Sequence, residues 1–561
     1  MKNNNNKDIE VELEELDSEG SESEKIGEVC DADTSGSIIT IKIKHRPDDL
    51  RLGQPLIIDT DKLLYYTLIQ RLYYPLNPIA EKFANSPFTG LIPPNQIEGV
   101  RGKDFYGLAD LGCLKIIPNK PEDELEYQEQ MREFDTIPPV FSMCRQVSAK
   151  EIELIYKTSE TTDSVGTLRG FTYEIPIDFG ALVKKPYGLF GRTGIGKSIL
   201  NKLLCLFILK HQVSQLLLFD MQGEYGLYSR ADKSKGLKFY FTDKIQIYRL
   251  GELKKGEKCI DDAEPFVIYK DQITSGDIIA SSQNLNEPSI NTLIKIENLI
   301  NNGTIEFDNL FDAINGIDPD EHDINLFTLR ALQNRVIPFE KYTFLKDRGE
   351  KEREDSLENI FSKLIEGKSI VIDFGTFGTN KHLYYFIANS ITRRLYEMYS
   401  QKEEESELPP LVIVVEEAHK FLKPSVINYT IFDRIAREMR KFQLTLAFVD
   451  QRPSQIDDEV FSQIANRLVM NLTDDKDIDK VVKNLPNSKN WRGVVVGLLK
   501  QQFFMYGDAI SVPSIIEVMN YNNEKLLKSK LGLEKTLAET IDEIEHSDVT
   551  KIFSDKENNN K

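Results

Sequence analysis

The stretch Gly188-Leu-Phe-Gly-Arg-Thr-Gly-Ile-Gly-Lys-Ser198 decides the fold of this 561-residue chain. Its last eight residues, 191–198, match the pattern G-x-x-x-x-G-K-[ST] at every fixed position. An apolar run precedes the pattern, and a helical run, 198–210, follows it. Glycines in this setting let consecutive backbone N–H groups curl around phosphate oxygens, and the following helix directs its positive end at them. We therefore expect a P-loop that joins a buried strand to a helix, in preference to a glycine-rich turn without nucleotide.

The P-loop pattern assigns a role to each of its positions. Lys197 would neutralise the β and γ phosphates of ATP, and the hydroxyl of Ser198 would ligate Mg²⁺. Arg192 faces either the nucleotide or a neighbouring subunit. The expected cofactors are thus ATP and Mg²⁺. The expected nucleotide-binding residues are Gly191, Arg192, Thr193, Gly194, Ile195, Gly196, Lys197 and Ser198.

Two adjacent acids end the most apolar strand pattern of the chain, Leu411-Val-Ile-Val-Val-Glu416-Glu417. Such a pair is common, and by itself it would indicate a solvated strand end. Together with a P-loop it indicates catalysis, in which Glu416 holds Mg²⁺ directly or through water and Glu417 polarises the attacking water. His419, two residues further on, fits a packing or hydrogen-bonding role better than a catalytic one.

Two further strand ends carry polar side chains, and open α/β sheets bind ligands beyond the carboxyl ends of their strands. One is Asp220-Met-Gln-Gly-Glu-Tyr225, and the other is Asp450-Gln451-Arg-Pro453. Gln451 is suited to sense a γ-phosphate from a neighbouring strand by hydrogen bonding. An ordinary polar strand end is an equally good interpretation of either segment taken alone.

Short buried-strand patterns alternate with longer helical patterns over residues 181–520, which is typical of an α/β domain with a parallel sheet covered on both faces. Within it, residues from about 225 to 368 are mostly helical in pattern and predict a helical insertion. Pro288 suits the first turn of one of its helices. The predicted strands of the sheet are 187–190, 216–219, 370–372, 411–415, 444–449, 468–472 and 503–506.

The region before this domain has a different pattern. Residues 25–180 contain short alternating strands separated by turns, which indicates a small barrel or sandwich, with long connections over 72–148. Residues 1–24 are acidic and poor in aromatic side chains, a composition typical of disorder. Residues 521–561 read as a charged helical segment with a loose tail. The predicted strands of the first region are 26–29, 37–43, 54–58, 63–69 and 151–156.

Composition narrows the range of functions. The formal net charge of −20 argues against a protein that coats nucleic acid with its whole surface, so any contact with DNA needs a local, sheltered basic surface. The five cysteines lie far apart, without a C-x-x-C pair, which favours reduced thiols. We find no apolar run near the roughly 20 residues that a membrane-spanning helix needs and no signal peptide pattern. We expect a cytoplasmic protein without membrane insertion.

Four segments in order, GRTGIGKS, FDMQGEYG, VIVVEEAHKF and IAREMRKFQLTLAFVDQRP, resemble the HerA family of hexameric DNA translocases, within the HerA/FtsK group of P-loop ATPases. The resemblance is colinear over residues 185–510, and the β-rich region stands where that family carries its HAS-barrel. The sequence departs from the family at two positions. Gln222 stands where the family often has His, and Asp450 stands where it usually has Ser or Thr.

The resemblance implies a RecA-like P-loop core with a helical insertion, preceded by a small HAS-barrel-like β-barrel. It implies a homo-hexameric ring, with double-stranded DNA in a central channel, in which an arginine of one subunit completes its neighbour's site. Arg440 is the first candidate for this arginine, and Arg437 is the second. The basic segment 227–238 is a candidate DNA-contacting loop, although a solvated loop explains it as well. The catalytic set is thus Glu417, Glu416, Lys197, Gln451, Arg440 and Arg437.

Family members often work with a nuclease or a sirtuin-like effector, in DNA end processing or in phage defence, so the resemblance implies such a partner at the barrel. Two other functions use the same nucleotide site. One is a motor that acts on protein, or in conjugation or secretion. The other is an ATP-gated scaffold for an effector.

Overall fold

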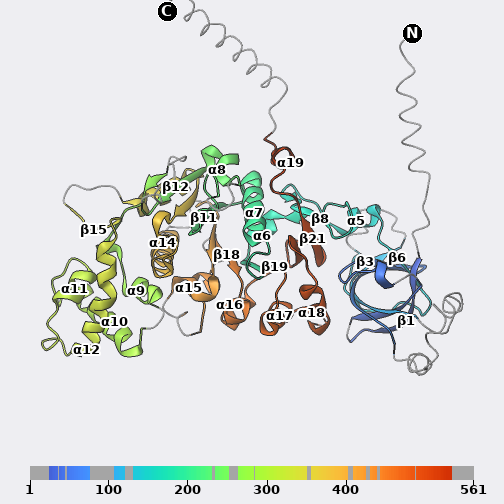
Figure 1. Ribbon diagram of the computed structural model, residues 1–561, viewed down its shortest axis with the longest axis horizontal. Helices are drawn as coiled ribbons and strands as arrows, with labels where there is room; N and C mark the ends of the chain where they lie inside the picture. Colours follow the sequence, from blue (N-terminus) through green and yellow to red (C-terminus); the bar gives the residue numbers. More distant parts are fainter. Residues whose placement is uncertain are drawn as a thin grey trace, which may run out of the picture.

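The computed structural model describes residues 25–533 apart from several internal stretches. A β-barrel lies at one end of the molecule, the helices of an insertion lie at the other, and a large sheet lies between them (Figure 1). The described ranges are 25–35, 37–44, 47–75, 106–119, 130–229, 234–251, 263–282, 285–349, 355–401, 408–424, 427, 430–438, 443–486 and 488–533.

The barrel is closed, in the strand order β1-β2-β5-β4-β3-β6. Alternate side chains of β2 point inward, including Ile39, Ile41 and Ile43, and pack with residues of the other strands into a separate apolar core. The predicted small barrel is confirmed. Its fifth and sixth strands lie inside the interval that we expected to hold connections. The bounds are β1 Lys25–Asp33, β2 Ile38–Ile43, β3 Pro55–Asp59, β4 Leu63–Tyr73, β5 Leu108–Pro118 and β6 Met143–Gln146.

The strand predicted over 151–156 is wrong, because this segment belongs to helix α5, Ala149–Ile155. Ser148 caps the helix: its side chain accepts the backbone N–H of Glu151, and the Glu151 carboxylate accepts the backbone N–H of Ser148. Arg145 of the barrel also donates to Glu151. The alternating apolar residues fit a strand equally well, so the cap and this ion pair decide for the helix.

The central sheet has eleven strands, in the order β13-β12-β16-β11-β17-β18-β10-β19-β20-β21-β8. Pairing is parallel from β13 to β19 and antiparallel from β19 to β8. Each of the seven predicted strands overlaps a strand of the sheet, although the one predicted over 468–472 shares only two residues with β19, and the predicted α/β fold class is confirmed. The bounds are β8 Gly166–Leu168, β10 Tyr187–Phe190, β11 Gln215–Asp220, β12 Ile245–Arg249, β13 Glu264–Pro265, β16 Ser369–Asp373, β17 Leu411–Glu416, β18 Leu444–Asp450, β19 Asn466–Val469, β20 Gln502–Tyr506 and β21 Ser514–Val518.

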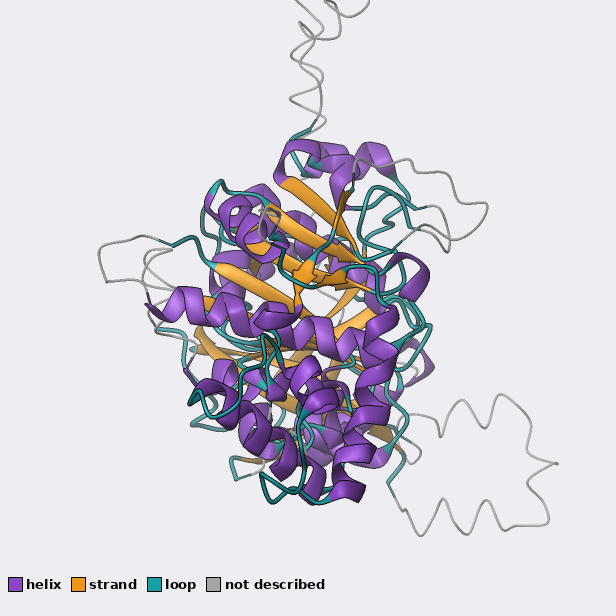
Figure 2. Ribbon diagram, turned by 90° about the vertical axis from the view of Figure 1, so that its left-hand side faces the viewer, coloured by secondary structure: helices purple, strands orange, loops and turns teal. Residues whose placement is uncertain are grey.

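Helices surround the strands of this sheet (Figure 2). Helix α7, Lys197–His211, follows β10 and is buried along ten consecutive residues, 200–209, so it is a core helix rather than an amphipathic one. The other helices outside the insertion are α6 Phe179–Val183, α8 Leu237–Tyr240, α14 Lys381–Gln401, α15 Ile431–Glu438, α16 Asp458–Ser462, α17 Asp475–Val482, α18 Ser488–Val496 and α19 Glu524–Lys530.

The interval from about 225 to 368 contains the expected helices, but it also supplies edge strands β12 and β13 to the sheet. Helix α10 begins at Glu287, next to Pro288, and Asn286 caps it. The helices of this interval, in addition to α8, are α9 Ser275–Ser281, α10 Glu287–Asn301, α11 Leu310–Gly316, α12 Leu326–Val336 and α13 Ser356–Ile365. Two small ladders complete the fold: β14 Ile268–Tyr269 with β15 Leu345–Lys346, and β7 Thr162–Asp163 with β9 Ile177–Asp178.

Two predictions extend beyond the described residues. The acidic segment 1–24 lies outside them, and so does the chain after 533, including most of the predicted C-terminal helical segment. In the part of the chain that is described, no helix is both long enough and apolar enough to cross a membrane.

Candidate nucleotide site

The P-loop runs from the end of β10 to the start of α7. Gly194 and Gly196 have backbone φ angles of +78° and +111°, which glycine adopts at little cost and other residues do not. Gly191 packs so closely on Met470, just after β19, that an added Cβ would lie 2.8 Å from the Met470 Cβ. The chain therefore curls tightly ahead of the α7 N-terminus, the geometry that a phosphate cradle requires.

Lys197 places its ammonium inside this curl. Its Nζ donates to the backbone carbonyls of Gly191, at 2.6 Å, and of Arg192, at 2.9 Å. Burial lowers the pKa of the Lys197 ammonium, while the charges of Asp450, Glu416 and Glu417 act in the opposite direction. A partly buried ammonium in a glycine loop fits the β and γ phosphates of a nucleotide. Ser198 follows it on the first turn of α7 and is partly exposed.

The strand order places the predicted catalytic groups beside the P-loop. Strands β17, β18 and β10 are neighbours and run parallel, so their carboxyl ends meet at one edge of the sheet. Gln451, directly after β18, accepts a hydrogen bond of 2.6 Å from the Thr193 hydroxyl in the P-loop. Gln451 is thus in contact with the loop from the side on which Glu416 and Glu417 lie.

Glu416 ends β17 in a polar but shielded setting. The Tyr225 hydroxyl donates to its Oε1 at 2.9 Å, and the Tyr384 hydroxyl donates to its backbone carbonyl at 2.8 Å. Burial raises the pKa of the Glu416 carboxyl to about 8, against the opposing effect of the Tyr225 hydrogen bond. A bound cation would offset the free-energy cost of ionising this buried carboxyl. Glu416 is therefore suited to be a metal ligand. In the described residues no three His, Cys, Asp or Glu side chains form a metal cluster.

Glu417 has the left-handed conformation, with φ +50°, directly after the strand. Its backbone N–H donates to the Val449 carbonyl of β18 at 2.9 Å, and its carboxylate lies 3.4 Å from Lys381 Nζ at the start of α14. Such a conformation is uncommon for a residue with a side chain and recurs at functional sites. It turns Glu417 away from the strand axis at the edge where the P-loop lies.

The segment 220–225 contributes Tyr225 to the site, a residue to which the sequence alone assigned no role. Asp220 is buried, and its carboxylate accepts the backbone N–H groups of Glu224 and Tyr225, each at 2.8 Å. Burial raises the pKa of Asp220 to about 6, and the charge of Asp373 adds to this effect. Asp220 thus shapes the turn, and Tyr225 delivers the hydroxyl that reaches Glu416. Tyr384 and Lys381 were also missed, because nothing in the pattern of α14 distinguishes them.

The remaining predicted residues lie away from the P-loop contacts or outside the described chain. Arg437, in the last turn of α15, pairs with Asp433 at 2.6 Å and with Glu459. Arg440 lies outside the described residues, as does 230–233 of the basic segment 227–238. In the described part of that segment, the Lys235 Nζ lies over the rings of Tyr228 and Phe239.

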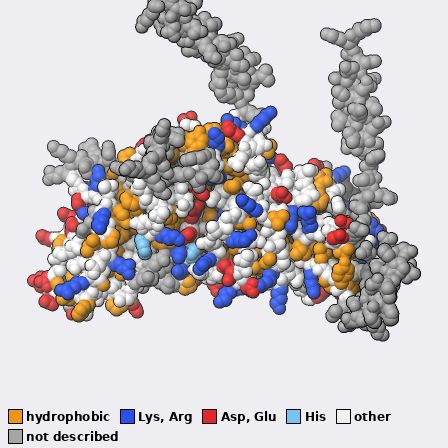
Figure 3. Space-filling view, in the orientation of Figure 1, with side chains coloured by type: hydrophobic (Ala, Val, Ile, Leu, Met, Phe, Trp, Pro, Cys, Tyr) orange, Lys and Arg blue, Asp and Glu red, His pale blue; other side chains and the backbone are white. Residues whose placement is uncertain are grey.

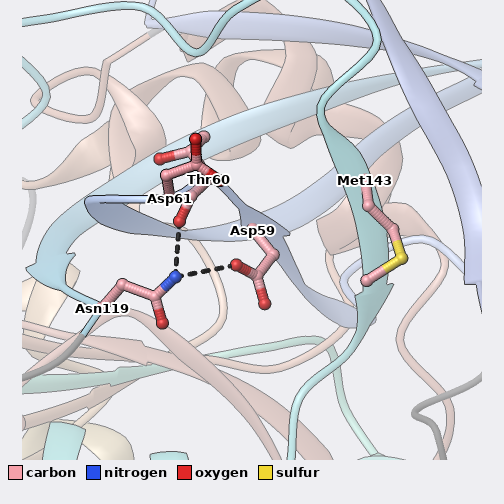
Figure 4. Close-up of a pocket in the computed structure, with 5 residues that line it drawn as sticks. All are labelled: Asp59, Thr60, Asp61, Asn119 and Met143. Atoms are coloured by element: carbon pink, nitrogen blue, oxygen red, sulfur yellow. Dashed lines mark hydrogen bonds between the residues drawn. The ribbon is translucent and has the colours of Figure 1, made fainter.

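A separate hollow of about 520 Å³ lies on the barrel (Figure 4). Several of its polar groups have partners: Asn119 donates to Asp59 at 3.0 Å and to the Thr60 carbonyl, and Arg145 binds the other oxygen of Asp59. Its lining residues come from barrel strands and their adjoining turns, and none belongs to the P-loop or to the strand ends around it. We assign the nucleotide to the P-loop. The residues that line the hollow give no reason to place a ligand there. The lining residues are Asp59, Thr60, Asp61, Asn119 and Met143.

Comparison with known proteins identifies the same region. Residues 163–395 match the family model of the central domain of helicase HerA. The DNA double-strand break repair helicase HerA of Pyrococcus furiosus is 34% identical over 137 residues, 23% of this chain and 24% of that protein. The protein of the same name from Saccharolobus solfataricus is 22% identical over 401 residues, 70% of this chain and 75% of that protein. The chain thus spans about a quarter of the first relative and three quarters of the second.

Among solved structures, VirB4 of Thermoanaerobacter pseudethanolicus aligns over 65% of this chain and 98% of its own, with a TM-score of 0.44 and 12% identity. The bacterial conjugative coupling protein TrwB aligns over 66% of this chain and 92% of its own, with a TM-score of 0.44 and 13% identity. Residues 163–395 thus resemble the central domain of helicase HerA, and the chain is similar to the HerA helicases named above.

Proposed function

We propose that this protein is an ATP-hydrolysing motor that assembles as a homo-hexameric ring and moves double-stranded DNA through its central channel. The observation that carries the proposal is the meeting of three parallel strands at one sheet edge. There β10 supplies the P-loop, β17 supplies Glu416 and Glu417, and β18 supplies Gln451. This edge combines a phosphate cradle, a metal ligand, a water-activating acid and a polar side chain that touches the loop.

Each group at this edge has a task in hydrolysis. Bound with Mg²⁺, ATP supplies the phosphoryl group whose transfer to water drives the motor. The loop N–H groups and Lys197 would hold the phosphates, and Ser198 and Glu416 would be the ligands for the metal. Glu417 orients the attacking water and accepts its proton, and Gln451 hydrogen-bonds the terminal phosphate.

The distribution of charged side chains supports a path for DNA through the central channel of the ring. A chain with a net charge of −20 repels DNA over most of its surface, so a phosphate-binding surface must be local. Figure 3 shows acidic side chains gathered at the end that carries α11 and α12, and Lys and Arg side chains over the middle of the same face. The relatives are named as DNA double-strand break repair helicases, which favours DNA as the substrate. The segment 227–238 is our candidate for the DNA-contacting loop, through phosphates rather than bases.

Ring assembly would complete the site with an arginine from the neighbouring subunit. Arg440 is the first candidate. Arg437 is the second, because its guanidinium is engaged by Asp433 and Glu459 within its own chain and would have to leave them. A cation at this position offsets the charge that develops on the transferred phosphoryl group.

The proposed motor works together with a partner protein. We propose a nuclease or a sirtuin-like effector that docks on the barrel, in DNA end processing or in phage defence. Three exposed apolar side chains on one barrel loop, Ile137, Val140 and Phe141, support such a contact. Phe141 is 78% exposed although it is a large aromatic residue.

The test combines native mass measurement with ATPase assays, with and without duplex DNA. The wild type should form a hexamer whose turnover rises with duplex DNA. Glu417→Gln should keep the hexamer and lose at least about a hundredfold in turnover. Glu174→Gln, a change at a surface carboxylate paired with Lys530, serves as the matched control and should retain wild-type turnover. A monomer whose turnover ignores DNA would contradict the motor, and full turnover in Glu417→Gln would contradict the role of that residue.

A further inference from the structure

A buried histidine and a buried aspartate join the two catalytic turns, and the chemistry described above uses neither. Asp450 is the last residue of β18, and His419 lies in the 3₁₀ turn Ala418–Lys420 just after β17. They are 1% and 2% exposed. The ring Nδ1 of His419 lies 2.8 Å from Asp450 Oδ1 and 3.0 Å from Oδ2.

Asp450 makes contacts in three directions. Its carboxylate accepts the backbone N–H of His419 at 2.5 Å, in the turn after β17, and the backbone N–H of Arg452 at 2.7 Å, in the turn after β18. Its own backbone carbonyl accepts the N–H of Gly191, the first residue of the P-loop, at 3.1 Å. A single residue therefore touches both catalytic turns and the phosphate loop.

The chemistry of this pair defines its hydrogen positions. A buried carboxylate is costly unless hydrogen bonds surround it, and Asp450 has two backbone donors and one imidazole. An ionised carboxylate only accepts hydrogen bonds, so the Nδ1 that faces it must carry the hydrogen. A Ser or Thr at position 450 offers a single oxygen and would not reach His419 and Arg452 with separate acceptor atoms.

The residues next to the pair are the ones that act on the nucleotide. Glu417 lies two positions before His419, in its left-handed conformation, and Gln451 directly follows Asp450. Gln451 in turn touches the P-loop through Thr193. The Glu417 carboxylate also lies 3.4 Å from the exposed Lys381, and such an exposed pair contributes little orientation.

We propose that Asp450 and His419 are a positioning pair, which holds Glu417 and Gln451 in one fixed geometry relative to the P-loop. Neither side chain is assigned a contact with the nucleotide, so we expect the loss of the pair to slow hydrolysis more than it weakens nucleotide binding. The inference rests on the proposed ATP hydrolysis. A displacement of about 1 Å at a reacting group is enough to cost roughly a hundredfold in rate, so the effect falls on kcat.

The test is a double-mutant cycle measured on the full-length protein. Asp450→Ser and His419→Ala should each lower the ATPase kcat by roughly ten- to a hundredfold, with KM for ATP within about threefold of the wild type. The double variant should lose no more than the more severe single variant, because the two residues act as one unit. Asp450→Asn keeps the shape and one acceptor oxygen, and it should recover part of the turnover lost in Asp450→Ser.

The matched control is a second histidine-aspartate contact, at the far end of α7. There His211 Nε2 lies 3.3 Å from Asp163 Oδ2, and Lys210 also binds Asp163. This contact is about 20 Å along the helix from Lys197. Asp163→Asn should lower the melting temperature as the site variants do but leave kcat within about twofold of the wild type.

Three results would overturn the inference. The single variants could keep the wild-type kcat, or the loss of kcat in the double variant could equal the product of the two single losses. The third is a KM for ATP that rises as steeply as kcat falls. Affinity for a non-hydrolysable ATP analogue, measured by fluorescence, keeps the test valid for variants without turnover. Failure of the proposed function is recognised separately, because the wild type itself would then hydrolyse no ATP.

Discussion

The fold disfavours the ionised form of the Glu416 carboxyl. The titration of this group can therefore be followed through the pH dependence of the free energy of unfolding. Burial raises the pKa of Glu416 from 4.5 to about 8, so the folded protein binds this proton more tightly than the unfolded chain does. The stabilising contribution is complete below about pH 4.5 and is lost as the pH rises toward 8. Asp220, with a pKa raised to about 6, acts in the same direction but has finished titrating by about pH 7.

We therefore predict that the free energy of unfolding of the nucleotide-free wild type falls between pH 6.5 and 9. In Glu416→Gln this fall should be smaller, by on the order of 2 kcal/mol, because the amide does not ionise. Urea unfolding across this pH range measures the difference. Glu133→Gln, at an exposed barrel carboxylate paired with Lys115, is the control and should follow the wild type. Identical pH dependence in wild type and Glu416→Gln would show that Glu416 titrates normally.

At the scale of single residues, the sequence predicts the groups that a short local pattern defines. The P-loop, Glu416, Glu417 and Gln451 all meet at one sheet edge, as their positions after apolar strands implied. Tyr384 reaches Glu416 across 32 positions, and no local pattern marks it. Its role depends on how α14 packs, which a pattern along the chain does not encode.

Helix α5 shows how a cap decides between two kinds of element. Its reciprocal hydrogen bonds between Ser148 and Glu151 begin the helix in a segment whose apolar alternation predicts a strand. We predict that Ser148→Ala lowers the free energy of unfolding by about 1 kcal/mol without changing ATPase kcat. Chemical unfolding with a parallel ATPase assay measures both effects. Lys150→Ala, at an exposed position of the same helix, should change neither, and equal stability of the two variants would contradict the role of the cap.

The strands near the middle of the main sheet were predictable because they are continuous apolar runs, buried on both faces. The missed strands of this sheet lie toward its two ends, and two of them are very short. β8 has three residues and β13 has two, and each is defined by its pairing partner rather than by its own composition. The cap of α5 was present in the sequence as Ser148 and Glu151, so that element could have been predicted.

In the assembled ring, we predict that catalysis crosses a subunit boundary. Lys197→Ala should abolish turnover by removing the phosphate contact, and Arg440→Ala should abolish it by removing the arginine given to the neighbour. Rings that contain both variants should recover measurable turnover, because some sites then combine an intact P-loop with an intact arginine. The measurement is the ATPase rate of co-expressed, co-purified variants.

Two controls define the result of this mixing experiment. Mixed Lys197→Ala and Glu417→Gln subunits should stay inactive, because both changes lie in the same half of the site. Inactive mixed rings of Lys197→Ala and Arg440→Ala would contradict an arginine supplied in trans at position 440. The sequence predicts neither the ring nor its partner from pattern alone, because both depend on surfaces that meet between chains rather than on contacts within one.

A triplex-displacement assay tests whether ATP hydrolysis moves this protein along duplex DNA. A labelled third strand bound to duplex DNA is released when a motor travels along the duplex, without strand separation. We predict release that requires ATP and Mg²⁺ with the wild type and no release with Glu417→Gln. A wild type that hydrolyses ATP at full rate on this DNA, yet leaves the third strand in place, would show that the protein does not move along duplex DNA.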